Sequence, residues 1–335
     1  METIEKKEDS LKKRYIFKLL ANLLGIPIAL VSLAVVPRSL GPASYGNFSF
    51  LTNFFAQATG FLDSSTSIAF YTKLSQRQHE TGLVAFYWRF IALIFGILFV
   101  FTLIANSTNI QQSLWPQQSA QFIWMALMYS TFLWLSQHIV RIIDAYGLTK
   151  GGELVRIATK ILGLVLILLL FWWQFITLTV YFVYHYIILV ASIAGWWYIL
   201  KKNDYSLFQQ KNLKKKELRN YITEFYRYSA PLIFYSIVSI GIAILDRWLL
   251  QYFGGSVQQG YFGLAFQLGA FCFLFAKAMT PIITREFSIA FGKKDIEAMN
   301  KLFQRYVPML YTICSYFSVF LSFQFQKIST LIVCS

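Results

Sequence analysis

The chain has 335 residues, of which 57% are hydrophobic, 19% aromatic and only 13% charged, and its formal net charge at pH 7 is +15. Since a soluble domain carries roughly 25% charged residues, too little polar surface is left to cover a water-facing globule, which predicts an integral membrane protein. The positive charge does not indicate a nucleic-acid partner, because the basic residues lie in short patches between apolar runs without any nucleic-acid motif.

Apolar windows long enough to cross a bilayer recur along the chain. Each is expected to be a helix, because the lipid interior offers the backbone no water. The expected fold is therefore all-α, with about nine transmembrane helices whose edges are defined to about two to four residues. These spans are 16–37, 45–72, 84–105, 120–142, 156–173, 177–200, 228–253, 260–284 and 304–325.

Basic residues gather in alternate connections, at the N-terminus and within 73–89, 141–160, 201–227 and 285–305, whereas the connections between them are almost free of charge. The positive-inside rule then places the N-terminal tail, 1–15, in the cytoplasm and the C-terminus of the chain outside. The longest basic connection, 201–227, is interpreted as a topology signal and a linker between two halves. A specific site for anionic lipid is the alternative.

Two glycine-containing corners, "PRSLGPASYGNFSF" at 37–50 and "QYFGGSVQQGYFGLAF" at 251–266, follow the same pattern. Adding 214 to a residue number places Gly41 on Gly255 and Gly46 on Gly260, with ten identities over 43 positions. Both copies start on the same side of the membrane, which predicts two parallel helical lobes around a central cavity. Gly41 and Gly46 themselves are interpreted as turn residues.

The lobes are expected at 16–200, with six helices, and at 228–335, with three. The 214-residue offset makes residue 335 equivalent to 121, so the second lobe is incomplete relative to the first. The chain is therefore expected either to be a truncated product or to depart from its own symmetry.

Polar residues inside the spans are candidates for lining a cavity, because they are costly in lipid. In the second span, Asn53, Gln57 and Ser64 share one helix face, with Asp63 beside it. Lining of the cavity and close packing between helices are the two interpretations.

In the eighth span, Gln267 and Lys277 lie on one face, and the offset places Lys277 on Asp63. The hypothesis is that Asp63 and Lys277 both look into the gap between the lobes, where Lys277 would meet a phosphate. Snorkelling of Lys277 to the interface is the alternative.

Two arginines are further candidates. Adjacent helical residues point about 100° apart, so Asp246 and Arg247 are expected to face different surroundings, one of them the cavity. The fork of Arg247 suits a phosphate or an acidic sugar. Arg38 could bind the same groups at the outer mouth or anchor the helix at the interface.

The sequence contains no Walker motif, no GxGxxG and no His/Cys/Asp set with metal spacing. We therefore expect that the protein is not an enzyme and that it has no catalytic residue, no metal and no cofactor. Any transport would draw on an ion gradient or on substrate concentration.

The segments "LANLLGIPIALVSLAVVPRSLGPASYGNFSF" and "ILDRWLLQYFGGSVQQGYFGLAFQL" (Ile244–Leu268) resemble Wzx-type O-antigen flippases, polysaccharide biosynthesis proteins of the multidrug/oligosaccharidyl-lipid/polysaccharide (MOP) exporter superfamily. The resemblance implies a MATE-like pair of six-helix lobes in the bacterial inner membrane. It also implies translocation of an undecaprenyl-diphosphate-linked oligosaccharide. The partners would be this substrate, membrane lipids, and polysaccharide polymerase and assembly proteins.

Three other functions remain open. An ion-coupled drug or metabolite antiporter of the same superfamily would need an acid in the first lobe, for which Asp63 is the candidate. A sugar polymerase or ligase is disfavoured, because such membrane enzymes need a large outer loop and every outer connection here is short. The third is an inactive, truncated flippase.

Overall fold

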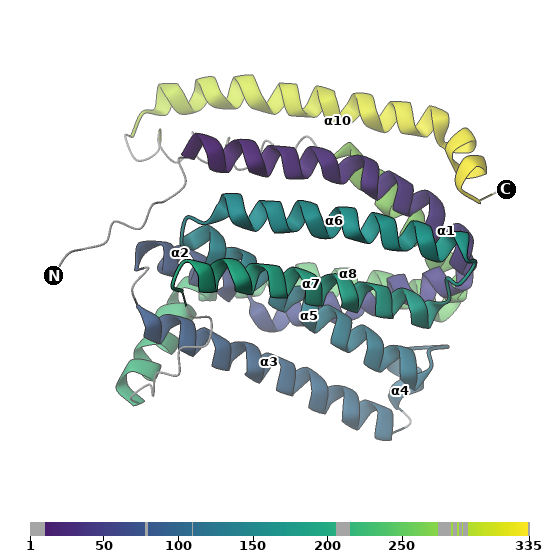
Figure 1. The fold of residues 1–335 in the computed structure, drawn as a ribbon, viewed down its shortest axis with the longest axis horizontal. Coiled ribbons are helices and arrows are strands. Elements are labelled where there is room, and N and C mark those ends of the chain that lie inside the picture. Colours follow the sequence, from purple (N-terminus) through teal and green to yellow (C-terminus); the bar gives the residue numbers. More distant parts are fainter. Residues whose placement is uncertain are drawn as a thin grey trace.

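In a computed structural model, the described residues are 11–77, 80–108, 110–205, 215–273, 283, 287, 290 and 294–333, and they form helices and short connections without any strand. The helices lie along the long axis of the molecule, with α10 at one side of the bundle and α3 at the other (Figure 1). They are α1 (Leu11–Asp63), α2 (Thr66–Gln76), α3 (Thr81–Ser107), α4 (Ile110–Leu114), α5 (Ala120–Ala145), α6 (Thr149–Trp172), α7 (Leu178–Lys202), α8 (Lys215–Cys272) and α10 (Ile296–Val333).

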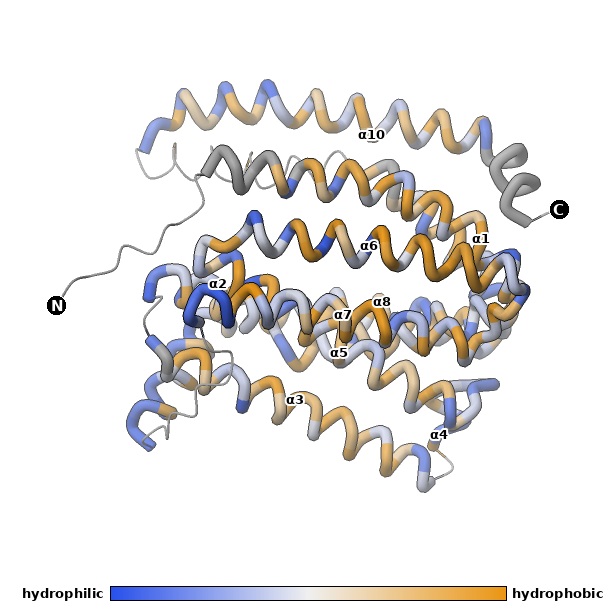
Figure 2. The backbone as a smooth tube through the Cα atoms, viewed as in Figure 1, coloured by the Kyte–Doolittle hydropathy of each residue, from blue (hydrophilic) through white to orange (hydrophobic). Residues whose placement is uncertain are grey.

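Six of the described helices are long and apolar enough to cross a membrane. Their outward surfaces carry large apolar side chains, such as Trp172 and Phe323 with exposed fractions of 84% and 82%. Water does not tolerate so much exposed apolar surface, whereas acyl chains do. The all-α, multi-pass membrane architecture expected from the composition is therefore confirmed, and Figure 2 shows the apolar middle of these helices. The six segments are Leu20–Asp63, Gly82–Ser107, Thr149–Trp172, Leu178–Lys202, Ile233–Ala270 and Ile296–Gln324.

Two of these six, within α1 and α8, are bent at a glycine. Gly41 has φ 72° and ψ 162°, and Gly255 has φ 73° and ψ −176°. An L-residue with a side chain rarely adopts such a φ, so glycine is required at both corners. The bent α1 thus covers the first two spans expected from the sequence, and the bent α8 covers the span 228–253 and the start of the span 260–284, of which residues 274–282 and 284 lie outside the described residues. The turn role of Gly41 is confirmed.

The expected continuous span 45–72 is wrong. The helix ends at Asp63, and Ser64 and Ser65 have positive φ angles of 43° and 66° before α2 begins. Ser64 therefore lies in a turn, where its hydroxyl donates to the Phe61 carbonyl at 2.6 Å, and it does not continue the helix face of Asn53 and Gln57.

Part of the expected linker 201–227 is helical. Residues 206–214 lie outside the described residues, but α8 already begins at Lys215. The second half of the linker is therefore helical.

The charge-poor and basic connections lie at opposite ends of the bundle. The bend of α1, α4 and the turn between α6 and α7 share one end (Figure 1). The start of α1, the junction of α2 with α3 and the start of α8 share the other, where hydrophilic residues gather in Figure 2. The alternation along the sequence therefore corresponds to two distinct membrane faces.

The buried core lies mainly among the helices of the N-terminal lobe. Its large fully buried side chains include Phe50, Phe55, Trp115, Leu127 and Phe182, from α1, the α4–α5 connection, α5 and α7. The described part of the C-terminal lobe packs on this core mainly through α8.

Candidate site between the two lobes

The two corners contact each other, and the contact is reciprocal. A Cβ atom added at Gly46 would collide with the Ser256 carbonyl and lie 2.8 Å from the Gly260 nitrogen. One added at Gly260 would collide with the Pro42 carbonyl and lie 2.9 Å from its carbon. The 214-residue offset relates Pro42 to Ser256 and Gly46 to Gly260. The two contacts are therefore equivalent, and each corner packs against the other through the same stretch of backbone.

This reciprocity explains why the corner occurs twice. A pair of related modules that meet about a twofold axis must each present the same patch to the other. Gly46 and Gly260 are helical, so the expectation that Gly46 serves the turn is wrong: both are glycine because two backbones meet there. Gly263 extends the contact, since a Cβ atom there would lie 2.6 Å from the Ser49 hydroxyl oxygen. We call residues 41–49 and 247–266 the corner junction.

Arg247 is buried at the corner junction, with an exposed fraction of 8%. Its Nη1 donates to Gln259 Oε1 at 3.2 Å and, more weakly, to Ser49 Oγ at 3.5 Å. Its guanidinium carbon lies 4.3 Å from the ring centre of Phe262 and 5.3 Å from that of Phe266. Among the described residues no carboxylate forms an ion pair with it, so neutral oxygens and aromatic faces hold this cation.

Two buried glutamines support this arrangement, and sequence reasoning missed both. The side-chain nitrogen of Gln259 donates to the Arg247 carbonyl, which ties the two arms of α8 together. Gln251 donates to the Pro116 carbonyl at 3.1 Å and the Ser256 hydroxyl at 3.0 Å. Neither glutamine has any exposed surface. The sequence signal that could have identified them is that two amides flank Gly254 and Gly255 within an otherwise apolar stretch.

The other candidates near this junction are on the surface. Asp246 is exposed while Arg247 is buried, so the two adjacent residues do face different surroundings. Gln267 and Arg38 are exposed as well. Lys277 lies outside the described residues.

Farther along α1, Asn53 and Gln57 are half-buried, and the Gln57 amide donates to the Asn53 side-chain oxygen at 3.4 Å. On the same arm, a Cβ atom added at Gly60 would lie 3.9 Å from Ile240 of α8. The polar stretch of α1 therefore runs beside the other lobe.

Asp63 is buried inside the N-terminal lobe. Its carboxylate accepts hydrogen bonds from Thr66 Oγ1 at 2.9 Å, from the nitrogen and hydroxyl of Ser67 at 3.2 and 2.7 Å, and from Tyr87 OH at 3.2 Å. These bonds start α2 and attach it to α3, in the manner of a helix cap. The carboxylate is thus occupied by donors of its own lobe, and its expected meeting with Lys277 stays a prediction.

No group of three or more His, Cys, Asp or Glu side chains suited to a metal occurs within the described ranges. The arrangement can recognise an anion through the Arg247 guanidinium, which lies at the contact between the two lobes.

The comparisons with known proteins agree with this architecture. The family model described as "Polysaccharide biosynthesis protein" matches residues 11–285. A solved structure titled "Inward-facing conformation of a multidrug resistance MATE family transporter of the MOP superfamily" superimposes with a TM-score of 0.59 at 14% sequence identity, covering 95% of this chain and 75% of that one. No curated protein matches the sequence.

Proposed function

Since the chain belongs to the polysaccharide biosynthesis protein family, we propose that it moves an undecaprenyl-diphosphate-linked oligosaccharide across a bacterial cytoplasmic membrane. Its family and fold are those of a membrane transporter or flippase of the MOP superfamily rather than of an enzyme. The oligosaccharide, as opposed to another substrate of such transporters, is the proposed part.

Arg247 carries this proposal. A buried guanidinium held by neutral oxygens and aromatic rings, without a carboxylate partner among the described residues, keeps its charge available. The planar fork of arginine pairs with phosphate through two parallel hydrogen bonds. A diphosphate linker entering between separated lobes would replace the weak contact with Ser49, and the rings would keep the guanidinium in position.

The orientation is part of the proposal. With the basic end of the bundle in the cytoplasm, as the positive-inside rule favours, the corner junction faces the periplasm. The glycine contact then lies on the periplasmic side, and a substrate made in the cytoplasm approaches from the opposite end. Polysaccharide polymerase and assembly proteins would receive the product.

The test is complementation of a strain that lacks its O-antigen flippase, with export measured at matched amounts of membrane-inserted protein. Arg247→Gln should lower export by about 10- to 100-fold, the effect of losing a charged hydrogen-bonding group. Arg247→Lys keeps the positive charge but loses the planar, two-donor guanidinium, so its export should lie between that of the wild type and that of Arg247→Gln. Arg305→Gln, on the exposed surface of α10, is the matched control. Full export by a stably inserted Arg247→Gln protein would exclude this role.

An ion-coupled antiporter is the second candidate, favoured by the buried carboxylate of Asp63 in the N-terminal lobe. In that case Asp63→Asn should abolish gradient-driven efflux of a cationic dye from vesicles while the protein stays folded. Ser67→Ala removes one hydrogen bond to the carboxylate without changing its charge, and it should retain efflux. If neither the wild type nor Ser67→Ala moves the dye, this candidate is rejected.

A further inference from the structure

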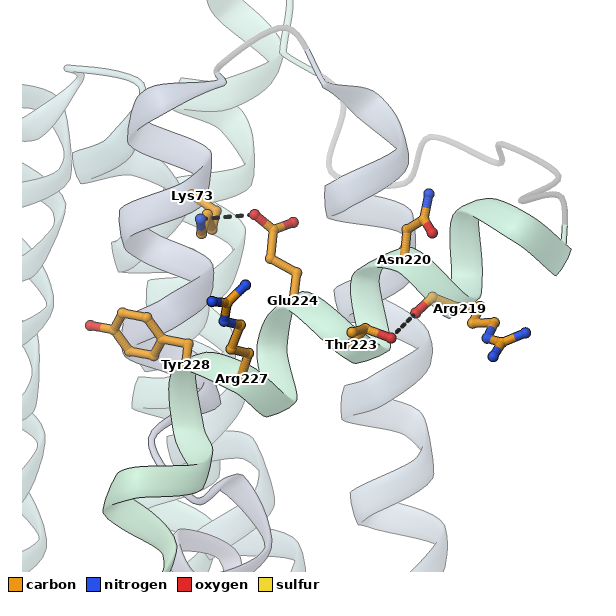
Figure 3. A pocket seen from close by; sticks show the side chains of 7 residues that line it. All are labelled: Lys73, Arg219, Asn220, Thr223, Glu224, Arg227 and Tyr228. Carbon is orange, nitrogen blue, oxygen red and sulfur yellow. Dashed lines mark hydrogen bonds and ion pairs between the residues drawn. The ribbon is translucent and has the colours of Figure 1, made fainter.

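A pocket of about 630 Å³ opens at the basic end of the bundle, between α2 and the first turns of α8 (Figure 3). This volume falls within the range of small-ligand sites, roughly 300–1,000 Å³. Besides Lys73 of α2, its lining comes from the α8 residues Arg219, Asn220, Thr223, Glu224, Arg227 and Tyr228. None of these residues takes part in the proposed transport through Arg247.

Among the lining residues named, the one carboxylate is that of Glu224, and two cations neutralise its charge. Glu224 pairs with Lys73 at 2.8 Å and with Arg77 at 2.9 Å. The hydrogen bond from Lys73 lowers the pKa of Glu224, so the carboxylate stays charged at neutral pH and its two partners stay in place.

Arg219 and Arg227 provide the excess positive charge. Neither forms an ion pair with any described residue, and both are exposed. In Figure 3, Arg227 lies on the same side as Glu224 and Lys73, whereas Arg219 extends from the other side of the helix. The Thr223 hydroxyl donates to the Arg219 carbonyl at 2.9 Å (Figure 3), so Tyr228 is the neutral lining residue left beside Arg227. The pocket therefore favours a compact anion.

The part of α8 that lines the pocket lies just outside an apolar segment, which is where lipid headgroups are expected. It precedes the membrane-crossing segment Ile233–Ala270 by a few residues. Its inner face is anchored, because Tyr221 and Phe225 each lie 5.3 Å, ring to ring, from Phe86 of α3.

The adjoining face is apolar yet open, with exposed fractions of 53% for Ile222 and 66% for Tyr226. A helix with one buried face, one apolar face and one cationic face is typical of segments that lie in the membrane interface. An anion that reaches this pocket can therefore arrive attached to a lipid tail.

We propose that this pocket binds a phosphate or diphosphate group carried by a membrane lipid. Arg227 and Lys73 supply the charge nearest the group, Tyr228 supplies a neutral hydrogen-bonding group, and Ile222 and Tyr226 lie beside the tail. Two lipids share this chemistry, a polyprenyl diphosphate and an anionic glycerophospholipid. This proposal does not depend on the proposed transport function, because the experiment that tests it measures binding and not transport.

The experiment uses the full chain in neutral detergent and a fluorescent short-chain prenyl diphosphate, with binding followed by anisotropy. Arg227→Gln should weaken binding about tenfold, the effect of one charged hydrogen-bonding group. Arg219→Gln should weaken it by about threefold, because this charge lies at the far edge. Lys202→Gln, an exposed cation at the same end of the bundle but outside the pocket, should change it by less than about twofold.

Glu224→Gln separates recognition from loss of structure. Removing the carboxylate frees Lys73 and leaves Arg77 paired with Glu80 alone, so the probe should bind about threefold more tightly, whereas local unfolding would weaken it. Weaker binding by Glu224→Gln, or an equal loss in Lys202→Gln and Arg227→Gln, would overturn the site.

Competition identifies the source of the phosphate. Displacement of the fluorescent probe by dioleoylphosphatidylglycerol, but not by dioleoylphosphatidylcholine, supports a general anionic-lipid site. Displacement by unlabelled prenyl diphosphate alone supports a diphosphate site, and displacement by inorganic pyrophosphate shows that the group is recognised without its tail. Equal displacement by phosphatidylcholine would mean that only the tail is bound, and would reject the proposal.

Discussion

The C-terminal lobe is attached to the N-terminal lobe in two chemically different ways. At the corner junction, backbones meet at Gly46 and Gly260, and the same contact is made twice. At the opposite end, the start of α8 is held on α2 and α3 by the side chains of Lys73, Arg77 and Glu224, together with Tyr221, whose hydroxyl bonds Glu80. We call this second contact the basic junction.

The difference predicts how firmly each contact is held. At the corner junction the two backbones touch directly, and hydrogen bonds from Arg247 to Ser49 and from Gln251 to the Pro116 carbonyl cross beside them. Exposed ion pairs tolerate small displacements and are screened by salt. The corner junction is therefore expected to be the more rigid contact, and the basic junction the more deformable one.

The largest effect is expected when the glycine contact is blocked. Gly46→Ala and Gly260→Ala each place a methyl group on a facing backbone, which should cost about 1–3 kcal/mol of folding stability or keep the lobes apart. The two variants should behave alike, because the contact is reciprocal. Thermal unfolding in detergent measures the first outcome. The rate of disulfide formation between cysteines introduced at Ser49 and Gly263, where an added Cβ would lie 3.1 Å from the Ser49 Cβ, measures the second.

Gly241→Ala is the control for this comparison. Gly241 is helical, lies in α8, and has no atom within 4 Å of an added Cβ. Alanine should be neutral or stabilising there by up to about 1 kcal/mol. A loss as large as that of Gly260→Ala would contradict the backbone-contact explanation.

A smaller effect is expected from Gln259→Leu. This change leaves the Arg247 guanidinium with a single weak hydrogen bond, to Ser49, beside the two aromatic rings, and removes the bridge between the arms of α8. An unsatisfied buried group costs about 1–3 kcal/mol, so unfolding should occur at lower temperature. The double variant Arg247→Leu with Gln259→Leu should recover part of this loss. Strictly additive losses would show that the two side chains do not interact.

The smallest effect is expected at the basic junction. Glu224→Gln should cost only about 0–1 kcal/mol, because the paired side chains are partly exposed. The effect should shrink at high salt, whereas that of Gly46→Ala should not.

The same pair predicts a pH dependence. Hydrogen bonding from Lys73 lowers the pKa of Glu224 in the folded protein. A group with a depressed folded pKa stabilises above its unfolded pKa and loses that contribution as the pH falls through the folded value. Hydrogen exchange within residues 215–228 should therefore be unchanged near neutral pH and increase, in excess of the intrinsic rate, only below the ordinary range of glutamate. Glu224→Gln should lack this acid response.

The sequence predicted more about the corners than about the polar site. The 214-residue offset identified Gly41 with Gly255 and Gly46 with Gly260, and their geometry agrees. Asp63 was recognised as costly in lipid, but the sequence did not identify Thr66, Ser67 and Tyr87 as its donors. Gln251 and Gln259 were missed, because nothing in an apolar segment tells whether an amide faces lipid, a cavity or the adjoining arm of its own helix.

The sequence by itself determined that the chain is a bundle of membrane helices with two related lobes, since hydropathy, loop charge and glycine spacing act over one span or one turn. Only the tertiary structure decided what these residues contact. Gly46 meets a backbone about two hundred residues away in the chain, and Arg247 is held by an amide from the other arm of α8. Such contacts depend on how the two arms of a bent helix, and the two lobes, pack together, and this packing is set by the fit of whole surfaces rather than by any local pattern.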